Sequence, residues 1–197
     1  DLPARLRLLR HFLDACEAVA YAHKLGVVHR DLKPDNVMVG EFGETRVVDW
    51  GLARWDADDR SADWATVTQP GEDPLAIVAG ADATRQGSIV GTPAYMSPEQ
   101  ARGEAVDTRS DVWSLGVMLW QLVAGQHPLA GRSTDQMLRA VRDQALPALR
   151  SSCPAAPAEL CAIVTRAMAA DPDERYPDAK ALAADVARYI DGRIVQA

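Results

Sequence analysis

Eight residues near the start of the chain constrain its fold and its chemistry most: His-Arg-Asp-Leu-Lys-Pro-Asp-Asn, residues 29–36. They include four charged side chains, one histidine and one amide. Apolar runs rich in valine flank them at 27–28 and 37–39, and valine favours β-strands. A polar loop between two buried strands is typical of a site whose side chains are held in place for binding or chemistry.

Three side chains in and after this loop carry oxygen atoms of the kind that hard cations bind. Asp31 and Asn36 lie within the loop, and Asp49 follows a third apolar run at 46–48. The glycine-rich stretch 40–44 separates the second and third apolar runs, which predicts a β-hairpin. Asp31, Asn36 and Asp49 are therefore candidate ligands of a metal ion.

The rest of the ordered sequence is helical in pattern. Apolar residues recur every three or four positions in five segments: 2–20, 111–124, 133–141, 157–169 and 178–190. The segment 111–124 is apolar on most sides, which predicts a central, buried helix. The expected fold class is α+β and mainly α, with about five helices and a small β-hairpin in one domain, residues 1–197.

Charge and composition restrict the classes of function. The chain has a formal net charge of -7, which argues against nucleic acid as its main partner. Most of this charge lies between Asp56 and Asp82, where seven acidic residues stand against Arg60 alone. Residues 55–86 show no sustained period, and we expect them to form an acidic, disordered insertion.

Localisation is expected to be cytoplasmic. No apolar run is long enough for a membrane span. The three cysteines show neither metal-type spacing nor even pairing, which favours reduced thiols: Cys16, Cys153 and Cys161. Three histidines outside the loop also lack metal-ligand spacing, and we expect them to be incidental: His11, His23 and His127.

Three ordered motifs together resemble those of protein kinases. The loop 29–36 matches the catalytic loop H-R-D-x-x-x-x-N position for position. Asp49-Trp50-Gly51 resembles the D-F-G motif, and Ser97-Pro98-Glu99 resembles the A-P-E motif. The chain is therefore identified as resembling the C-terminal lobe of a eukaryotic-like, bacterial-type serine/threonine protein kinase. The resemblance extends over essentially all 197 residues.

The resemblance implies ATP and Mg²⁺ as cofactors and assigns a role to each site residue. Asp31 would orient the substrate hydroxyl and accept its proton, and Lys33 would reach the transferring phosphate. Asn36 and Asp49 would hold the Mg²⁺ ions on the nucleotide phosphates. Met38 matches the position whose apolar side chain lies beneath the adenine.

Other matched positions imply structural or regulatory roles. Lys33 with Thr92 resembles the serine/threonine branch. His29 and Trp50 resemble members of an apolar column that links the two lobes. Three further residues resemble a carboxylate that holds the catalytic loop and an ion pair that ties the activation segment to the helical base: Asp111, and Glu99 with Arg175.

The activation segment would run from 49 to 99 and contain the acidic insertion. One hypothesis is that the insertion is only solvated chain. A sharper hypothesis is that Thr84 or Ser88 is phosphorylated and pairs with Arg30, which would order the segment.

One part of the kinase pattern is missing from the sequence. It has no G-x-G-x-x-G and no strand resembling V-A-I-K, so we expect the small N-terminal lobe to lie outside these residues. The 197 residues alone are then expected to bind ATP poorly and to transfer no phosphate. Alternatives are a pseudokinase or kinase-fold interaction module, and a fragment that is only a folding remnant.

The resemblance also sets expectations for partners. The substrate would be a protein serine or threonine, and a dimer for autophosphorylation stays open. Many similar bacterial kinases continue into a membrane anchor, so this chain is expected to be cytoplasmic by itself or the cytoplasmic part of an anchored protein.

Overall fold

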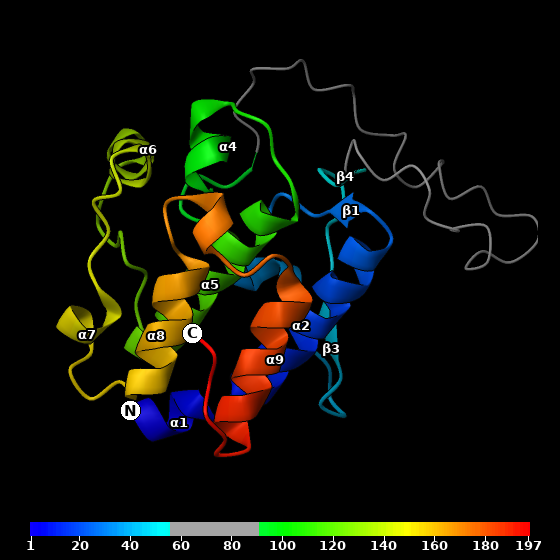
Figure 1. The fold of residues 1–197 in the computed structure, drawn as a ribbon, viewed down its shortest axis with the longest axis vertical. Coiled ribbons are helices and arrows are strands. Elements are labelled where there is room, and N and C mark those ends of the chain that lie inside the picture. The colour runs from blue at the N-terminus through cyan, green and yellow to red at the C-terminus, as the bar shows by residue number, and fades with distance from the viewer. Residues whose placement is uncertain (56–90) are drawn as a thin grey trace, which may run out of the picture.

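A computed structural model describes residues 1–55 and 91–197. Four long helices form its core: α2 (Leu9–Lys24), α5 (Thr108–Ala124), α8 (Ala158–Ala167) and α9 (Ala179–Ile190). They pack together, with α2 beside α9 and α8 beside α5 (Figure 1). The predicted insertion at 55–86 and the candidate phosphorylation sites Thr84 and Ser88 fall almost entirely outside the described residues.

Helix α5 is central and buried, as its apolar sequence predicts. Side chains on all its sides are almost inaccessible, including those of Trp113, Leu115 and Leu119. Gly116 allows α8 to pack closely against α5, because a Cβ atom at this position would lie 2.9 Å from the Cβ of Ala167 in α8. The buried position of α5 fixes its first turn, which contacts the loop 29–36.

The first predicted helix is divided into two. Helix α1 (Leu2–Leu6) ends one turn before α2 begins. At the junction, the Leu8 N–H donates to the carbonyl of Arg5 at 2.9 Å, a three-residue spacing that tightens the turn. The Arg5 guanidinium also donates to the carbonyl of Val123 near the end of α5, so α1 is tied to the central helix.

Three short helices complete the helical part. Helix α6 (Thr134–Arg142) begins at a capping box formed by Ser133 and Gln136. Helices α4 (Pro98–Arg102) and α7 (Leu149–Ser152) were not predicted, because neither is long enough to show an apolar period. Helix α4 packs against α6 near the first turns of α5 (Figure 1).

Two antiparallel strand pairs lie beside α2. The predicted hairpin forms from β2 (Val37–Val39) and β3 (Thr45–Val47), with Val37 opposite Val47. Strand β1 (Val27–Val28) was predicted without a partner and pairs with β4 (Arg54–Trp55). The strand β4 was not predicted, since two residues carry no alternation.

Within residues 1–55 and 91–197, no helix is both long enough and apolar enough to cross a membrane. The three cysteines are free thiols, two of them in the core.

Candidate active site

The buried carboxylate of Asp111, in the first turn of α5, binds the backbone of the loop 29–36. It accepts hydrogen bonds from the backbone N–H groups of His29 at 2.8 Å and Arg30 at 2.9 Å. A third bond comes from the His23 side chain at 2.9 Å. Arg30 has a left-handed backbone with φ of 72°, so these bonds stabilise a turn that non-glycine residues seldom adopt.

Asp111→Asn is expected to lower the free energy of unfolding by about 1.5–3 kcal/mol. The amide keeps the shape but offers one acceptor oxygen, so at least one of the three buried N–H donors loses its partner. Urea unfolding measures the loss. Asp143→Asn, at an exposed position without a side-chain hydrogen bond among the described residues, is the matched control and is expected to change stability by less than about 0.5 kcal/mol. Equal effects of the two variants would contradict the role given to Asp111.

His29 is fully buried and connects three parts of the site. Its Nε2 lies 3.1 Å from the carbonyl oxygen of Val48, and its Nδ1 accepts from the Asp31 N–H at 3.3 Å. These partners fit the tautomer with the proton on Nε2. The ring also contacts the ring of Trp50, with centroids 4.5 Å apart. The contact expected between His29 and Trp50 is therefore present.

The carboxylate of Asp31 lies at the centre of a compact polar cluster. It accepts from the Lys33 ammonium at 2.6 Å and from the Thr92 N–H at 2.7 Å. The same ammonium donates to the Thr92 hydroxyl at 2.9 Å. Burial alone would raise the pKa of Asp31, but the hydrogen bonds from Lys33 and Thr92 outweigh it and hold this pKa below its usual range. Asp31 is therefore a carboxylate at neutral pH.

Gly91 allows the chain at Thr92 to approach the loop this closely. Its φ is +117°, and a Cβ atom there would lie 2.9 Å from the carbonyl oxygen of Arg30. A larger residue would push Thr92 away from Asp31. The cluster thus depends on Thr92, which lies 59 positions after Lys33 in the chain.

Asn36 and Asp49 lie at adjacent ends of the β2–β3 hairpin. The Val48 N–H donates to the carbonyl of Asn36 at 2.9 Å, which places Asp49 one residue from this bond. The buried Asn36 amide donates to the carbonyl of Asp31 at 2.8 Å, which leaves its side-chain oxygen to accept. Asp49 is exposed and has a φ of 62°.

These two oxygen-bearing side chains fit a magnesium ion bound together with phosphates. Mg²⁺ in such sites takes one or two carboxylates from the protein and its other ligands from phosphate and water. Among residues 1–55 and 91–197, no three His, Cys, Asp or Glu side chains are grouped to hold a metal by themselves. The side chains of Asn36 and Asp49 could provide two oxygen ligands for such a cation.

Met38 is not buried by the described residues. Its side chain is 58% exposed, next to the half-exposed Val39, on the strand that carries Asn36 at its start. Met38 lies opposite Arg46 in the hairpin. An apolar surface is thus displayed beside the polar cluster.

Arg30 is a partly buried cation of the loop. Its Nε has no hydrogen-bond partner within the described part of the chain. Burial lowers the pKa of Arg30, and the guanidinium of Arg54 in β4 lowers it further, against the opposite effect of Asp111. Two cationic side chains therefore lie near each other, Arg30 in the loop and Arg54 in β4.

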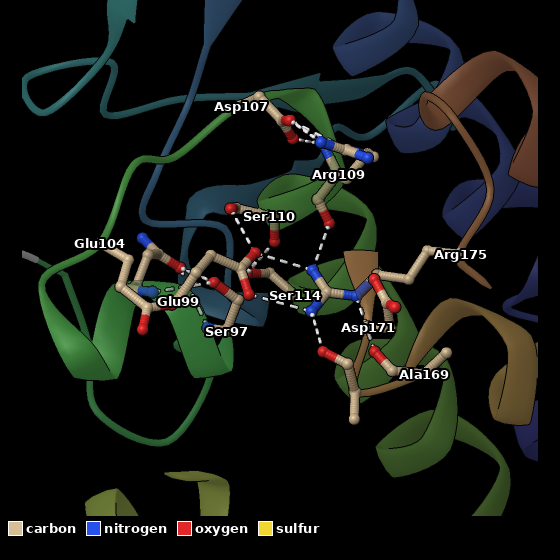
Figure 2. A network of polar contacts seen from close by, with 12 residues as sticks. Ser97, Glu99, Glu104, Asp107, Arg109, Ser110, Ser114, Ala169, Asp171 and Arg175 are labelled. Carbon is tan, nitrogen blue, oxygen red and sulfur yellow. Dashed lines mark hydrogen bonds and ion pairs between the residues drawn. The ribbon is translucent and has the colours of Figure 1, made fainter. Parts of the chain in front are cut away.

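The predicted ion pair between Glu99 and Arg175 forms in the core of the helical base (Figure 2). Arg175 Nη1 and Nη2 donate to the two carboxylate oxygens at 2.7 and 2.9 Å, and Ser110 donates at 2.5 Å. Arg175 also donates to the carbonyls of Ala169 and Arg109. Burial would raise the pKa of Glu99, but the bonds and charge of Arg175 hold it below the usual range.

All three histidines expected to be incidental have defined partners, so that prediction was wrong. The His11 Nδ1 lies 3.1 Å from the Thr45 hydroxyl oxygen. His23 bonds Asp111 and accepts from the Ala179 N–H at the start of α9. His127 lies 3.0 Å from the carbonyl oxygen of Ala94. No sequence signal identifies these contacts, because the partners are distant in the chain and none of the three histidines belongs to a motif.

Comparisons with known proteins identify the family of the chain. The family model for the protein kinase domain matches residues 7–186. The serine/threonine-protein kinase PknB of Mycolicibacterium smegmatis is 36% identical over 188 residues, which are 95% of this chain and 27% of that protein. A probable serine/threonine-protein kinase PknB of Bifidobacterium longum is 38% identical over 92% of the chain and 24% of its own length.

A third relative extends the same pattern. The serine/threonine-protein kinase PknD of Protochlamydia amoebophila is 34% identical over 95% of the chain and 19% of its own length. The chain thus spans about a quarter or less of the curated relatives it matches. Since the family model covers most of its residues, the chain belongs to the protein kinase domain family.

Proposed function

We propose that this chain is the large, C-terminal lobe of a serine/threonine protein kinase that transfers the γ-phosphate of ATP to a protein hydroxyl. The observation that carries the proposal is the cluster of Asp31, Lys33 and Thr92, whose contacts lie between 2.6 and 2.9 Å. The activation segment in this proposal runs from 49 to 99. Its described C-terminal part, 91–99, contacts the loop at Thr92 and the helical base at Glu99.

The residues of the cluster divide the work of transfer. Phosphoryl transfer passes through a loose transition state, so it needs positioned groups and neutralised charge more than covalent chemistry. Asp31, held as a carboxylate, accepts a hydrogen bond from the substrate hydroxyl and takes its proton as transfer completes. Lys33 provides a positive charge that reaches the transferred phosphoryl oxygens. Thr92 holds both side chains in place through its hydrogen bonds to Asp31 and Lys33.

Asn36 and Asp49 would hold magnesium on the nucleotide. The cation supplies charge neutralisation and fixes the phosphates for in-line attack. The protein contributes a buried amide, oriented by the carbonyl of Asp31, and an exposed carboxylate. Because the hairpin joins Asn36 to Val48, the two ligands and Asp31 form one rigid unit.

Met38 supports an adenine position on the apolar surface next to this unit. We also propose that a small lobe outside residues 1–197 covers the same surface, since the sequence has no glycine-rich phosphate loop and no strand lysine. In this arrangement the 197 residues hold half of the nucleotide site. The domain would act in the cytoplasm, by itself or as part of an anchored protein.

Nucleotide binding tests the proposed metal ligands. It is measured on the full-length protein, meaning these residues together with the proposed small lobe. Asp49→Asn is expected to weaken Mg²⁺-dependent ATP binding by about fivefold or more, because two unit charges about 4 Å apart already interact by about 1–4 kcal/mol and a direct ligand lies closer to the cation. Isothermal titration with and without Mg²⁺ measures the change. Glu41→Gln, an exposed carboxylate in the hairpin turn, is the control and leaves binding unchanged.

The same titration separates the proposal from its alternative. A kinase-fold interaction module without catalysis need not couple nucleotide to magnesium. Wild-type protein that binds no ATP, or binds it equally well without Mg²⁺ and in Asp49→Asn, would contradict the proposed use of Asn36 and Asp49.

A further inference from the structure

His127 lies in the turn that follows α5, and both of its ring nitrogens have partners. Nε2 is 3.0 Å from the carbonyl oxygen of Ala94, and Nδ1 accepts from the Leu129 N–H at 3.0 Å. One nitrogen therefore donates across to the 91–95 segment while the other accepts from its own turn. Burial lowers the pKa of His127, with the Ala94 carbonyl acting in the opposite direction. The ring is thus neutral at neutral pH, as these two bonds require.

Tyr95, next to Ala94, is fixed from three sides. Its ring meets the edge of the His127 ring, with centroids 5.1 Å apart. Its hydroxyl donates to Gln121 at 2.6 Å, and its carbonyl accepts from the Ser114 hydroxyl at 2.8 Å. Both Gln121 and Ser114 belong to α5, so His127 is the contact from outside that helix.

The segment held in this way ends at the proposed transfer site. The Tyr95 N–H donates to the carbonyl of Thr92 at 2.9 Å, which closes a four-residue turn. At the start of the turn, the Thr92 N–H donates to Asp31. A single tight turn therefore has the carboxylate of Asp31 at one end and His127 at the other. Residues 92–95 are only partly buried, so a protein chain can contact them.

We propose that His127 is a positioning residue for the protein substrate: by holding the carbonyl of Ala94, it fixes the 92–95 turn against which the substrate backbone lies. The inference rests on the proposed kinase function and adds a residue outside its three motifs. A substrate that presents its hydroxyl to Asp31 must pass this turn, since Thr92 contacts Asp31 directly. The proposed magnesium ligands, Asn36 and Asp49, lie at the hairpin, so His127 is expected to affect binding of the protein substrate and not of the nucleotide.

Three variants of His127 separate this role from a general structural one. His127→Ala removes both hydrogen bonds. The Gln side chain in His127→Gln has an N–H donor at about the reach of Nε2, so it keeps the bond to Ala94. The shorter Asn side chain in His127→Asn has an acceptor near Nδ1, so it keeps the bond to Leu129 and loses the one to Ala94. Gln and Asn are thus matched amides, of which only Gln keeps the hydrogen bond to the carbonyl of Ala94.

Steady-state kinetics of the full-length protein with a serine-containing protein substrate measure the effect. KM for the protein substrate is expected to rise about fivefold in His127→Ala and His127→Asn, the effect of one lost hydrogen bond, and to stay within twofold in His127→Gln. The kcat and the KM for ATP are expected to stay within twofold in all three. Unchanged KM in His127→Ala, or equal losses in the Gln and Asn variants, would overturn the proposal.

Hydrogen exchange of residues 91–96 provides a readout that does not need phosphate transfer. Faster exchange is expected in the Ala and Asn variants and wild-type exchange in the Gln variant. If the wild-type protein transfers no phosphate, the proposed function fails, and the exchange result still decides whether His127 fixes the turn. Exchange that is unchanged in His127→Ala overturns the inference in either case.

Discussion

Asp31→Asn is expected to lower the kcat of the full-length protein by about 10²–10⁴-fold, the usual contribution of a positioned proton acceptor. The asparagine oxygen can still accept from the Thr92 N–H, so the fold of the loop is kept. The amide cannot take the proton of the substrate hydroxyl. Its NH₂ group replaces the carboxylate oxygen that accepts from the Lys33 ammonium at 2.6 Å, so this hydrogen bond is lost. The KM for ATP is expected to change little, because Asp31 does not hold the phosphates.

The control for this variant comes from the same loop. Asp35→Asn changes the same functional group at an exposed position that makes no side-chain hydrogen bond to the described residues. It is expected to leave kcat within about twofold. A kcat of Asp31→Asn within tenfold of wild type, at full folding by circular dichroism, would show that the carboxylate is not the proton acceptor.

Arg175→Met is expected to lower the free energy of unfolding by about 3–5 kcal/mol, because it leaves the carboxylate of Glu99 buried without its partner. The Arg175 guanidinium is completely buried and bonds both oxygens of Glu99. It also donates to backbone carbonyls and lies over the Trp113 ring at 5.1 Å. Since domains are stable by about 5–15 kcal/mol, the loss would remove a large share of stability. Denaturant unfolding measures it.

An exposed pair provides the control for the buried one. Arg193 bonds Asp191 at 2.5 Å, but both side chains are more than half exposed. Arg193→Met is therefore expected to cost less than about 1 kcal/mol. In the double variant Glu99→Gln with Arg175→Met, the loss should be smaller than the sum of the single losses, because no buried charge remains. Equal costs for the Arg175 and Arg193 variants would contradict the importance of burial.

The depressed pKa of Glu99 also predicts how stability depends on pH. In the unfolded chain a glutamate titrates near its ordinary pKa of about 4.3, and in the folded protein it titrates lower. The stabilisation from Glu99 is then fully present above the unfolded pKa and is lost as pH falls through the folded pKa. Arg175→Met should remove this acid dependence, and unfolding at several pH values tests it.

Local patterns in the sequence predicted the elements that carry them. Alternating and helical periods identified the β2–β3 hairpin and the helices α2, α5, α6, α8 and α9. The break between α1 and α2 was missed because one helical period continues across it. The helices α4 and α7 and the strand β4 were missed because they are too short to show a period. Strand β4 exists through pairing with β1, which no local propensity encodes.

The candidate site shows the same division. The loop 29–36 was visible as a motif, and the pairing of Glu99 with Arg175 was predicted from resemblance although the two residues are 76 positions apart. The contacts of His23 with Asp111 and of His127 with Ala94 were not foreseen. A histidine outside any motif gives no sign in the sequence of which distant carbonyl or carboxylate it will meet. Only the packing of α5 against the loops determines those partners.

The central claim is that the cluster around Asp31 performs phosphoryl transfer. Incubation of the full-length protein with ATP labelled at the γ-phosphate, Mg²⁺ and a serine- and threonine-containing protein substrate tests it most directly. The expected result is label on serine or threonine that disappears in Asp31→Asn and on chelation of Mg²⁺, but not in Asp35→Asn. The contradicting result is a folded full-length protein that transfers no label, or that labels its substrate equally well with Asp31→Asn.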